Sequence, residues 1–235
     1  MKAIRIHEHG SINVLKYEDT DEPKCGLNQV KVKIYASSIN HLDLWIRKGL
    51  PNLRISFPMV LGSDGAGKIV EIGKNINNFK VGDDVVIQPG VFCKNCINCQ
   101  QDDENYCSTY GILGENYDGV QSEYAVLDIS NIYPMPSILT YNEAASMPLV
   151  FMTAYQMLVK RAMLKKNETV LIYGGSSGIG SAAIQICKNI GAKIISTAGN
   201  SNKMQFCLDS GSNYVVDHKS KYMYEKIKNI TNNAG

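Results

Sequence analysis

A glycine-rich stretch, Gly174 to Gly180, separates an apolar run from an amphipathic segment, and it constrains the fold more than any other feature. Residues 169–173 read Thr-Val-Leu-Ile-Tyr, which is typical of a buried parallel strand. Apolar residues then recur at helical spacing over 179–190, and Gly191 suits the end of a helix. The sequence therefore predicts a strand, a tight loop and a helix.

The same alternation continues to the end of the chain. We expect strands at 193–197 and 214–216, and helices around 204–208 and 223–230. Alternating strands and helices form a parallel sheet with right-handed crossovers, so residues 166–235 are predicted to be half of a doubly wound α/β domain. Such a domain normally has six strands. At about 30 residues per unit, we expect roughly 90 further residues in the full-length protein.

The first part of the chain has a different pattern. Short strands are predicted at 30–34, 68–72 and 84–87, with glycines at or near their ends. Residues 1–135 are therefore expected to form a β-rich antiparallel barrel or sandwich. Residues 142–160 are predicted to be helical, within a segment, 136–165, that links the two domains.

The charge balance excludes several functions. The 235 residues carry 24 Lys and Arg against 22 Asp and Glu, a formal charge of +2, so no basic patch for nucleic acid or membrane is expected. The first ten residues lack the apolar core of a signal peptide, and no apolar run approaches a membrane span. We expect a soluble cytoplasmic protein.

The glycine loop is the candidate cofactor site. Gly175, Ser177 and Gly180 occupy the three positions of the G-x-G-x-x-G pattern, with serine at the second. That pattern needs a tight turn at the first position, close approach of the pyrophosphate at the second, and close helix packing at the third. Because the loop joins a strand to a helix, we expect its residues to contact a dinucleotide rather than form an ordinary turn: Gly175, Ser176, Ser177, Gly178, Ile179 and Gly180.

The end of the second strand indicates which dinucleotide binds. NAD sites place an acidic residue there to bind the ribose 2′-hydroxyl. Residues 197–203 contain no acid, but they include Lys203, which suits the 2′-phosphate of NADP(H). The alternative is that Lys203 is only solvated and either cofactor binds.

Four cysteines lie close together in the sequence, at Cys93, Cys96, Cys99 and Cys107. Four thiolates match a closed, structural zinc site, and we expect one zinc in a lobe of about residues 90–110. An iron–sulfur cluster is the main alternative. Disulfides are not expected in a reduced compartment. The other cysteines, at 25, 187 and 207, are expected to have no part in the site.

Taken together, these motifs resemble the medium-chain dehydrogenase/reductase superfamily, of the zinc-type alcohol dehydrogenase and quinone oxidoreductase kind. The resemblance runs through the segments 62–67 and 81–83, the four-cysteine lobe, Thr153 and the glycine loop. It implies a GroES-like barrel followed by a partial Rossmann domain, and a chain that is truncated at its C-terminus.

The resemblance also bears on a second metal site. In zinc alcohol dehydrogenases a cysteine, a histidine and a second cysteine hold the catalytic zinc, and those positions match Asn40, Ser63 and Leu149. A glutamate position matches Asp64, and a hydroxyl relay position matches Leu42. None of the three ligand positions carries a good zinc ligand, so the resemblance implies a structural zinc and no catalytic zinc.

Further cofactor contacts are implied by the resemblance alone. His41 falls where the family has a basic residue near the pyrophosphate, and Thr153 falls near the nicotinamide. Asn200 and Lys203 match residues near the 2′-phosphate in quinone reductases, and His218 falls near the adenosine ribose. His41 and His218 also have plain structural interpretations.

We therefore expect an NADPH-dependent oxidoreductase that transfers hydride to a quinone, enone or other carbonyl compound, with Asn40 and Asp64 as candidate catalytic residues. Asn40 would donate to the substrate oxygen, and Asp64 would orient its neighbours. Alternatives are a zinc alcohol dehydrogenase that uses Asp64 and His41 as ligands, or a non-enzymatic or inactive truncated relative. We expect a homodimer or homotetramer at full length, and residues 1–235 alone to be inactive.

Overall fold

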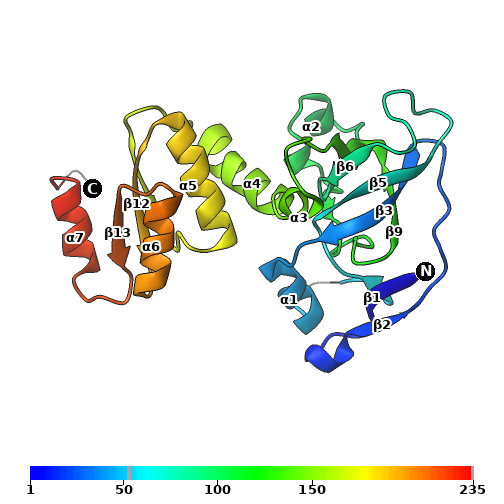
Figure 1. Ribbon diagram of the computed structural model, residues 1–235, viewed down its shortest axis with the longest axis horizontal. Helices are drawn as coiled ribbons and strands as arrows, with labels where there is room; N and C mark the ends of the chain where they lie inside the picture. The colour runs from blue at the N-terminus through cyan, green and yellow to red at the C-terminus, as the bar shows by residue number, and fades with distance from the viewer. Residues whose placement is uncertain (52–53, 234–235) are drawn as a thin grey trace. The chain divides into compact units, whose positions relative to one another are not determined.

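The computed structural model describes residues 1–51 and 54–233 (Figure 1). The chain divides into two compact units, Met1–Leu149 and Val150–Gly235. The first consists mainly of antiparallel strands, and the second alternates strands with helices. This is the fold class that the sequence predicts, a GroES-like domain followed by a short Rossmann-type sheet.

The first unit is built around a five-stranded antiparallel sheet with the order β10-β6-β5-β3-β9. Two smaller sheets accompany it, with the orders β2-β1-β4 and β7-β8. The strands of this unit are β1 Lys2–Ile6, β2 Lys16–Asp19, β3 Gln29–Ser37, β4 Met59–Val60, β5 Gly65–Ile72, β6 Asp84–Ile87, β7 Gly90–Val91, β8 Gly111–Ile112, β9 Tyr124–Asp128 and β10 Ile132–Pro134.

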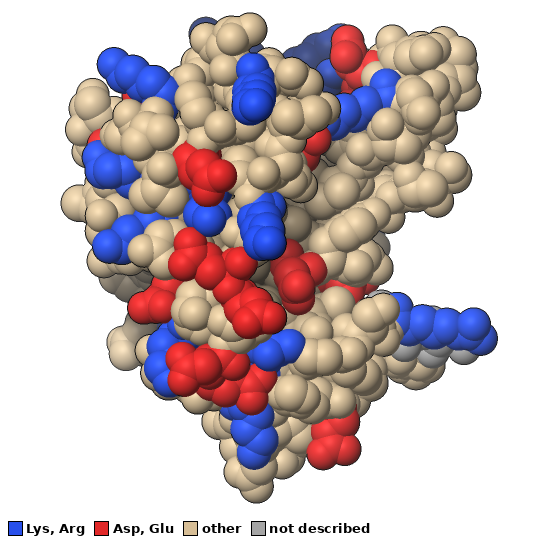
Figure 2. Space-filling model, turned by 90° about the vertical axis from the view of Figure 1, so that its right-hand side faces the viewer, with Lys and Arg blue, Asp and Glu red and all other residues tan. Residues whose placement is uncertain are grey.

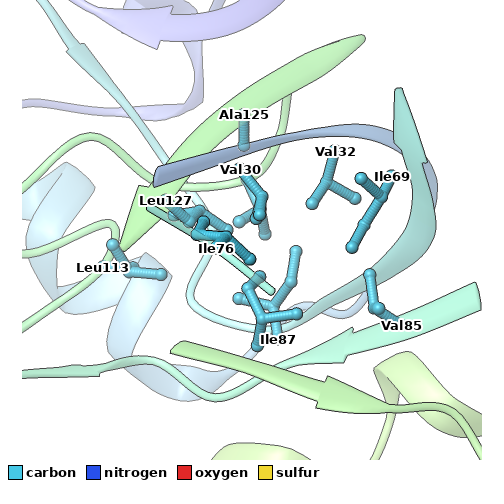
Figure 3. Packing of buried hydrophobic residues seen from close by; sticks show 11 residues of the cluster. Val30, Val32, Ile69, Ile76, Val85, Ile87, Leu113, Ala125 and Leu127 are labelled. Atoms are coloured by element: carbon cyan, nitrogen blue, oxygen red, sulfur yellow. The ribbon is translucent and has the colours of Figure 1, made fainter. Parts of the chain in front are cut away.

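Alternate residues of these strands form the main core of the unit. Val30 and Val32 of β3 point to the same side as Ile69 of β5, and Figure 3 shows them packed together with side chains from β6 and β9. Both valines are completely buried, as the alternation of apolar and charged residues in β3 predicts. The pairing of β3 with β5 shifts register twice, which bends the sheet.

Helices and short helical turns complete the first unit. Helix α1, His41–Lys48, buries Ile46 in a separate small core with Ile6 and Met59. Helix α3, Tyr141–Ala145, packs on strands β3 and β5. The remaining helical segments are α2 Ile97–Gln100 and the single 3₁₀ turns Ile12–Val14, Glu104–Tyr106 and Ile129–Asn131.

The helical segment predicted over 142–160 is present but divided. Helix α3 ends before Pro148, and α4 then runs over Pro148–Tyr155. It continues as a π-helical segment, Gln156–Arg161. The boundary between the compact units falls within α4, after Leu149.

The second unit is a three-stranded parallel sheet with the order β11-β12-β13. Helix α5 begins at the glycine loop, and Gly191 ends it in the left-handed conformation, as predicted. The strands are β11 Thr169–Ile172, β12 Lys193–Ala198 and β13 Tyr214–Asp217, and the helices are α5 Gly178–Ile190, α6 Ser201–Ser210 and α7 Met223–Ile230. The predicted pattern of three strands and three helices is confirmed.

Charges of both signs share the surface. Figure 2 shows a band of acidic side chains with lysine and arginine side chains on either side of it. Ion pairs link neighbouring elements, for example Lys2 to Asp19, and Lys31 to both Glu22 and Glu71. Among the described residues, no helix is long and apolar enough to cross a membrane.

Candidate functional site

The glycine loop follows β11 and has the crowding that a phosphate-binding turn requires. Gly174 takes a φ of +72°, so the tight turn lies one residue before the position predicted for it, Gly175. A Cβ on Gly175 would lie 2.8 Å from Cβ of Ser196, and one on Gly180 would lie 2.3 Å from the carbonyl oxygen of Gly174. Both positions therefore need glycine because of the close strand–helix packing.

Ser177 stands where the pattern usually has its second glycine, and it begins helix α5. Its Oγ accepts a hydrogen bond from the Gly180 N–H at 3.0 Å, as a capping residue does. The hydroxyl hydrogen stays available for a ligand oxygen. The rest of the loop, Ser176, Gly178 and Ile179, leads into the exposed first turn of the helix.

The carboxyl ends of β12 and β13 lead into three further residues predicted for the dinucleotide, Asn200, Lys203 and His218. Asn200 caps helix α6 by accepting from the Lys203 N–H at 2.9 Å, and the Lys203 side chain is exposed. His218 is half-buried and stacks on Tyr173, with ring centroids 5.5 Å apart. Side chains from three loops thus gather at the edge where parallel sheets bind ligands.

Asp64 is the centre of a hydrogen-bonded cluster in the first unit. Its side chain is completely buried. One carboxylate oxygen accepts from Nδ2 of Asn40 at 2.8 Å and from Oγ of Ser38 at 3.2 Å. The other accepts from the N–H of Leu149 at 2.9 Å. Both oxygens are therefore occupied by donors of the protein.

Asn40, which precedes helix α1, is a half-buried member of this cluster. Asn40 is the N-cap residue, and its N–H donates to Asp43 Oδ2 at 2.6 Å. The Asn40 amide nitrogen is directed to Asp64. His41, the first helical residue, is exposed and meets the ring of Trp45 edge-on.

The environment of Asp64 changes its acidity. Burial raises the pKa of Asp64 to about 6, against the opposing hydrogen bonds from Asn40, Leu149 and Ser38. The ionised carboxylate therefore costs the folded state about 3 kcal/mol, which is the shift from 3.8 at 1.36 kcal/mol per pH unit.

This shift predicts a pH dependence of stability. The pKa of Asp64 is higher in the folded protein than in the unfolded chain, so its protonated carboxyl stabilises the folded state. This contribution to the free energy of unfolding is complete below pH 3.8 and is lost as the pH rises through about 6. Asp64→Asn has no such titration, so the Tm of the variant minus that of the parent should increase between pH 5 and pH 8. Thermal unfolding of both proteins at several pH values measures this difference, and a constant difference would contradict the assignment.

The other two positions matched to ligands of the family's catalytic zinc carry no good zinc ligand; they are Ser63 and Leu149. Ser63 is completely buried, and its hydroxyl has no hydrogen-bond partner among the described residues. Leu149 has an aliphatic side chain and serves the cluster through its N–H. Thr153 lies half-buried in α4 of the second unit.

The four predicted cysteines converge at one point of the first unit. Their sulfur atoms lie within 4.8 Å of one another, and they form the single group of three or more potential metal ligands in the part of the chain that the structure describes. The pKa of Cys107 is lowered to about 6 by hydrogen bonds from the Thr109 hydroxyl and the Cys93 N–H. A Cys107 thiolate supported by these donors fits a tetrahedral zinc site.

Sequence reasoning missed three residues of these clusters. Ser38 supports Asp64, and no motif marks it because the contact joins two segments 26 residues apart. Thr197 and Lys219 border the loop after β12. Thr197 lies at the end of one predicted parallel strand, and Lys219 follows the next one. This placement was the available signal, because the carboxyl ends of parallel strands meet at one edge of the sheet.

Comparison with known families matches both parts of the chain. Residues 26–137 match the family described as "Alcohol dehydrogenase GroES-like domain", and residues 178–235 match "Zinc-binding dehydrogenase". Both matches agree with the fold of the unit in which they lie.

Individual relatives give the same result. The chain is 34% identical to an NAD-dependent alcohol dehydrogenase of Sulfolobus acidocaldarius over all of its own length and 68% of the relative's. It is 31% identical to human quinone oxidoreductase, of which it covers 64%. A crystal structure of an NAD-dependent alcohol dehydrogenase superposes with a TM-score of 0.97 at 36% identity, over the whole chain and 68% of that structure. The chain thus spans about two thirds of the length of these relatives.

Proposed function

This chain belongs to the medium-chain dehydrogenase/reductase superfamily of NAD(P)-dependent oxidoreductases, and from that premise we propose that the full-length protein uses NADPH to reduce quinones or enones without a catalytic zinc. The substrate is a small molecule, and the proposed setting is a cytoplasmic homodimer or homotetramer. The observation that carries this proposal is the hydrogen-bonded cluster around Asp64.

That cluster occupies the positions matched to the family's catalytic zinc site. Asn40, Ser63 and Leu149 supply no thiolate and no imidazole. Asp64 has both oxygens engaged by Ser38, Asn40 and the Leu149 N–H. Zinc prefers sulfur and nitrogen ligands in a tetrahedron, and this donor set does not offer them. The residues therefore favour chemistry based on hydrogen bonds.

The lack of zinc ligands at these positions restricts the substrate. A simple ketone develops its negative charge on one oxygen, which a metal normally stabilises. An enone or quinone spreads that charge over a conjugated system, so a few oriented hydrogen-bond donors suffice. NADPH would supply the hydride, and the protein supplies orientation and donors.

Asn40 is the proposed donor to the substrate oxygen. Its Nδ2 carries two hydrogens, of which one is held by Asp64. Because an ionised carboxylate accepts and never donates, Asp64 fixes the amide with nitrogen toward itself and leaves the second N–H for a ligand. Asp64 is thus proposed to act as a positioning residue, through Asn40.

The four cysteines are proposed to hold one structural zinc. Cys93, Cys96, Cys99 and Cys107 satisfy the coordination number of a closed site, which leaves no position for a substrate. Zinc bound there would stabilise the lobe that contains them, because the free energy of metal binding contributes to folding. An iron–sulfur cluster would give visible absorption, which distinguishes the two.

The loops of the second unit are proposed to bind the dinucleotide. Residues 175–180 would receive the pyrophosphate at the N-terminus of α5, with His41 as a further contact and Thr153 near the nicotinamide. Asn200, Lys203 and His218 would surround the adenosine ribose. Residues 197–203 contain no carboxylate that would repel a 2′-phosphate.

We expect NADPH to bind more tightly than NADH. Lys203→Ala should weaken NADPH binding about tenfold and leave NADH binding nearly unchanged, because one charge-assisted hydrogen bond to a phosphate is worth about 1.4 kcal/mol or more. Fluorescence titration of both cofactors measures the two dissociation constants. Lys226→Ala, an exposed lysine on α7, is the matched control. Equal affinities for the two cofactors in the parent protein would refute the NADPH assignment.

A second candidate is a zinc-dependent alcohol dehydrogenase, which the name of the Sulfolobus relative makes worth testing. It would need Asp64 and His41 as unusual ligands. His41 is exposed, whereas Asp64 is completely buried. The two candidate functions are separated by measuring turnover of an enone and of a simple alcohol, together with the zinc content of the same protein. The reductase turns over the enone with one zinc per chain, whereas the alcohol dehydrogenase turns over the alcohol with two. Absence of any turnover with bound cofactor would favour a non-enzymatic relative.

A further inference from the structure

One buried hydroxyl connects the glycine loop to His218. Thr197 lies near the end of β12 and is completely buried. Its Oγ1 accepts from the N–H of Gly174 at 3.0 Å, and its carbonyl oxygen accepts from the N–H of Gly175 at 2.9 Å. Thr197 therefore holds two successive N–H groups at the turn that precedes α5.

The same hydroxyl oxygen lies 3.4 Å from Nδ1 of His218. A hydroxyl has one hydrogen and two lone pairs, and Gly174 already donates to one of the lone pairs. Since a buried hydroxyl hydrogen without an acceptor is costly, it points to Nδ1. In that arrangement Nδ1 accepts the hydrogen bond and Nε2 carries the ring proton.

The Nε2 atom lies close to the backbone of Gly199. A Cβ built on Gly199 would lie 2.8 Å from Nε2 of His218 and 3.1 Å from Cε of Lys219. Gly199 therefore allows the imidazole and the stem of Lys219 to lie against the backbone where the loop after β12 begins. The ring is also fixed from the side by stacking on Tyr173.

The lysines on the segments that follow β12 and β13 favour an oxygen-rich, anionic ligand at this edge of the sheet. Lys203 lies in the first turn of α6, and Lys219 follows β13. The carboxylate at this edge is that of Asp217, which accepts the N–H of Lys219 at 2.9 Å. An N–H donor on His218, together with lysines on the segments after β12 and β13, suits an oxygen on the adenosine ribose, either a 2′-hydroxyl or a 2′-phosphate.

We propose that Thr197 is a positioning residue that couples the glycine loop to His218 and holds His218 as an Nε2–H donor to the ribose 2′-substituent of the cofactor. This inference rests on the proposed NADPH-dependent function and adds to it a residue that acts without touching the cofactor. Its consequence is that loss of one buried hydroxyl at β12 weakens recognition of the ribose.

The tautomer of His218 tests the proposal in the unmodified protein. Selective ¹⁵N-labelling of the four histidines, with His218→Gln to identify the resonance, reports the protonation of each ring nitrogen at pH 8. The expected result is a proton on Nε2 and none on Nδ1. A proton on Nδ1 would overturn the proposal, whatever the variants do.

Binding of two adenosine nucleotides gives a second, independent test. Adenosine 2′,5′-bisphosphate and adenosine 5′-monophosphate probe the phosphate and the hydroxyl separately, by calorimetry and without turnover. Thr197→Val should weaken binding of the bisphosphate about tenfold and abolish the single tautomer, and Thr197→Ser should restore both. The matched control is Ser212→Ala, which removes another buried hydroxyl, bonded to Ser196 at 2.9 Å, and should change neither.

The outcomes separate this proposal from the proposed function. Unchanged binding and an unchanged tautomer in Thr197→Val would overturn the role of Thr197 and leave the NADPH assignment intact, as would a failure of Thr197→Ser to restore them. If Thr197→Val weakens binding of the monophosphate alone, the His218 donor contacts the 2′-hydroxyl. In that case it does not contribute to the preference for NADPH over NADH. If the unmodified protein binds neither probe, the proposed cofactor is wrong, and the tautomer still decides the role of Thr197.

Discussion

Cys96→Ser is expected to reduce the zinc content of the purified protein from about one per chain toward zero and to lower its Tm by on the order of 10 °C. Cys96 is one of four sulfur ligands that lie within 4.8 Å of one another. A serine hydroxyl is a poor zinc ligand, and three thiolates leave the tetrahedron open. Residues 90–110 contain few buried apolar side chains, so they depend on the metal for their structure.

Elemental analysis after desalting measures the zinc content, and thermal unfolding measures the stability. Cys25→Ser is the matched control. The Cys25 thiol lies outside the cluster and donates to the carbonyl oxygen of Gln29 at 3.0 Å, a bond that serine can also make. If Cys96→Ser keeps one zinc per chain and the parent Tm, the four-cysteine site is not the zinc site.

Asn40→Ala is expected to lower kcat for enone reduction about a hundredfold, because it removes the proposed donor to the substrate oxygen. Asp64→Asn should have a similar effect for a different reason. An asparagine at position 64 has only one amide oxygen, so its NH₂ group can face Asn40 Nδ2 and set two donors against each other. The Asn40 amide would then turn over and present its carbonyl oxygen to the substrate.

Steady-state kinetics at saturating NADPH test these roles. The parent protein is compared with three variants, Asn40→Ala, Asp64→Asn and Ser38→Ala. Ser38→Ala removes the longer of the two side-chain hydrogen bonds to Asp64 and leaves the Asn40 contact in place, so it should lower kcat less than about fivefold. The distinguishing result is the order of the three variants. Full activity in Asn40→Ala, or a larger loss in Ser38→Ala than in Asp64→Asn, would contradict the proposed roles of Asn40 and Asp64.

The parallel sheet could be predicted from the sequence because its signals are local. The run 169–173, the glycine loop and the helical spacing of 179–190 all agree on one structure, and β11 and α5 occupy those residues. The order of the strands follows from the connections between them. The antiparallel sheet was predicted less completely, because pairings such as β10 with β6 depend on contacts between distant residues.

The candidate sites divide in the same way. The cysteine cluster and the glycine loop have fixed spacings, so their members could be named in advance. Residue Gly174, and not Gly175, takes the positive φ, a detail of backbone geometry that composition does not reveal. Ser38 and Thr197 escaped notice because each acts through a single hydroxyl whose partners lie on other segments.

The central claim is that this protein reduces conjugated carbonyl compounds without a catalytic zinc. The most direct test is the zinc-to-protein ratio of full-length protein that actively reduces an enone with NADPH. We predict a ratio near one, unchanged in Asp64→Asn even though that variant loses activity. A ratio near two in the active protein, falling to one on substitution of Asp64 or His41, would contradict the account and establish a zinc-dependent alcohol dehydrogenase.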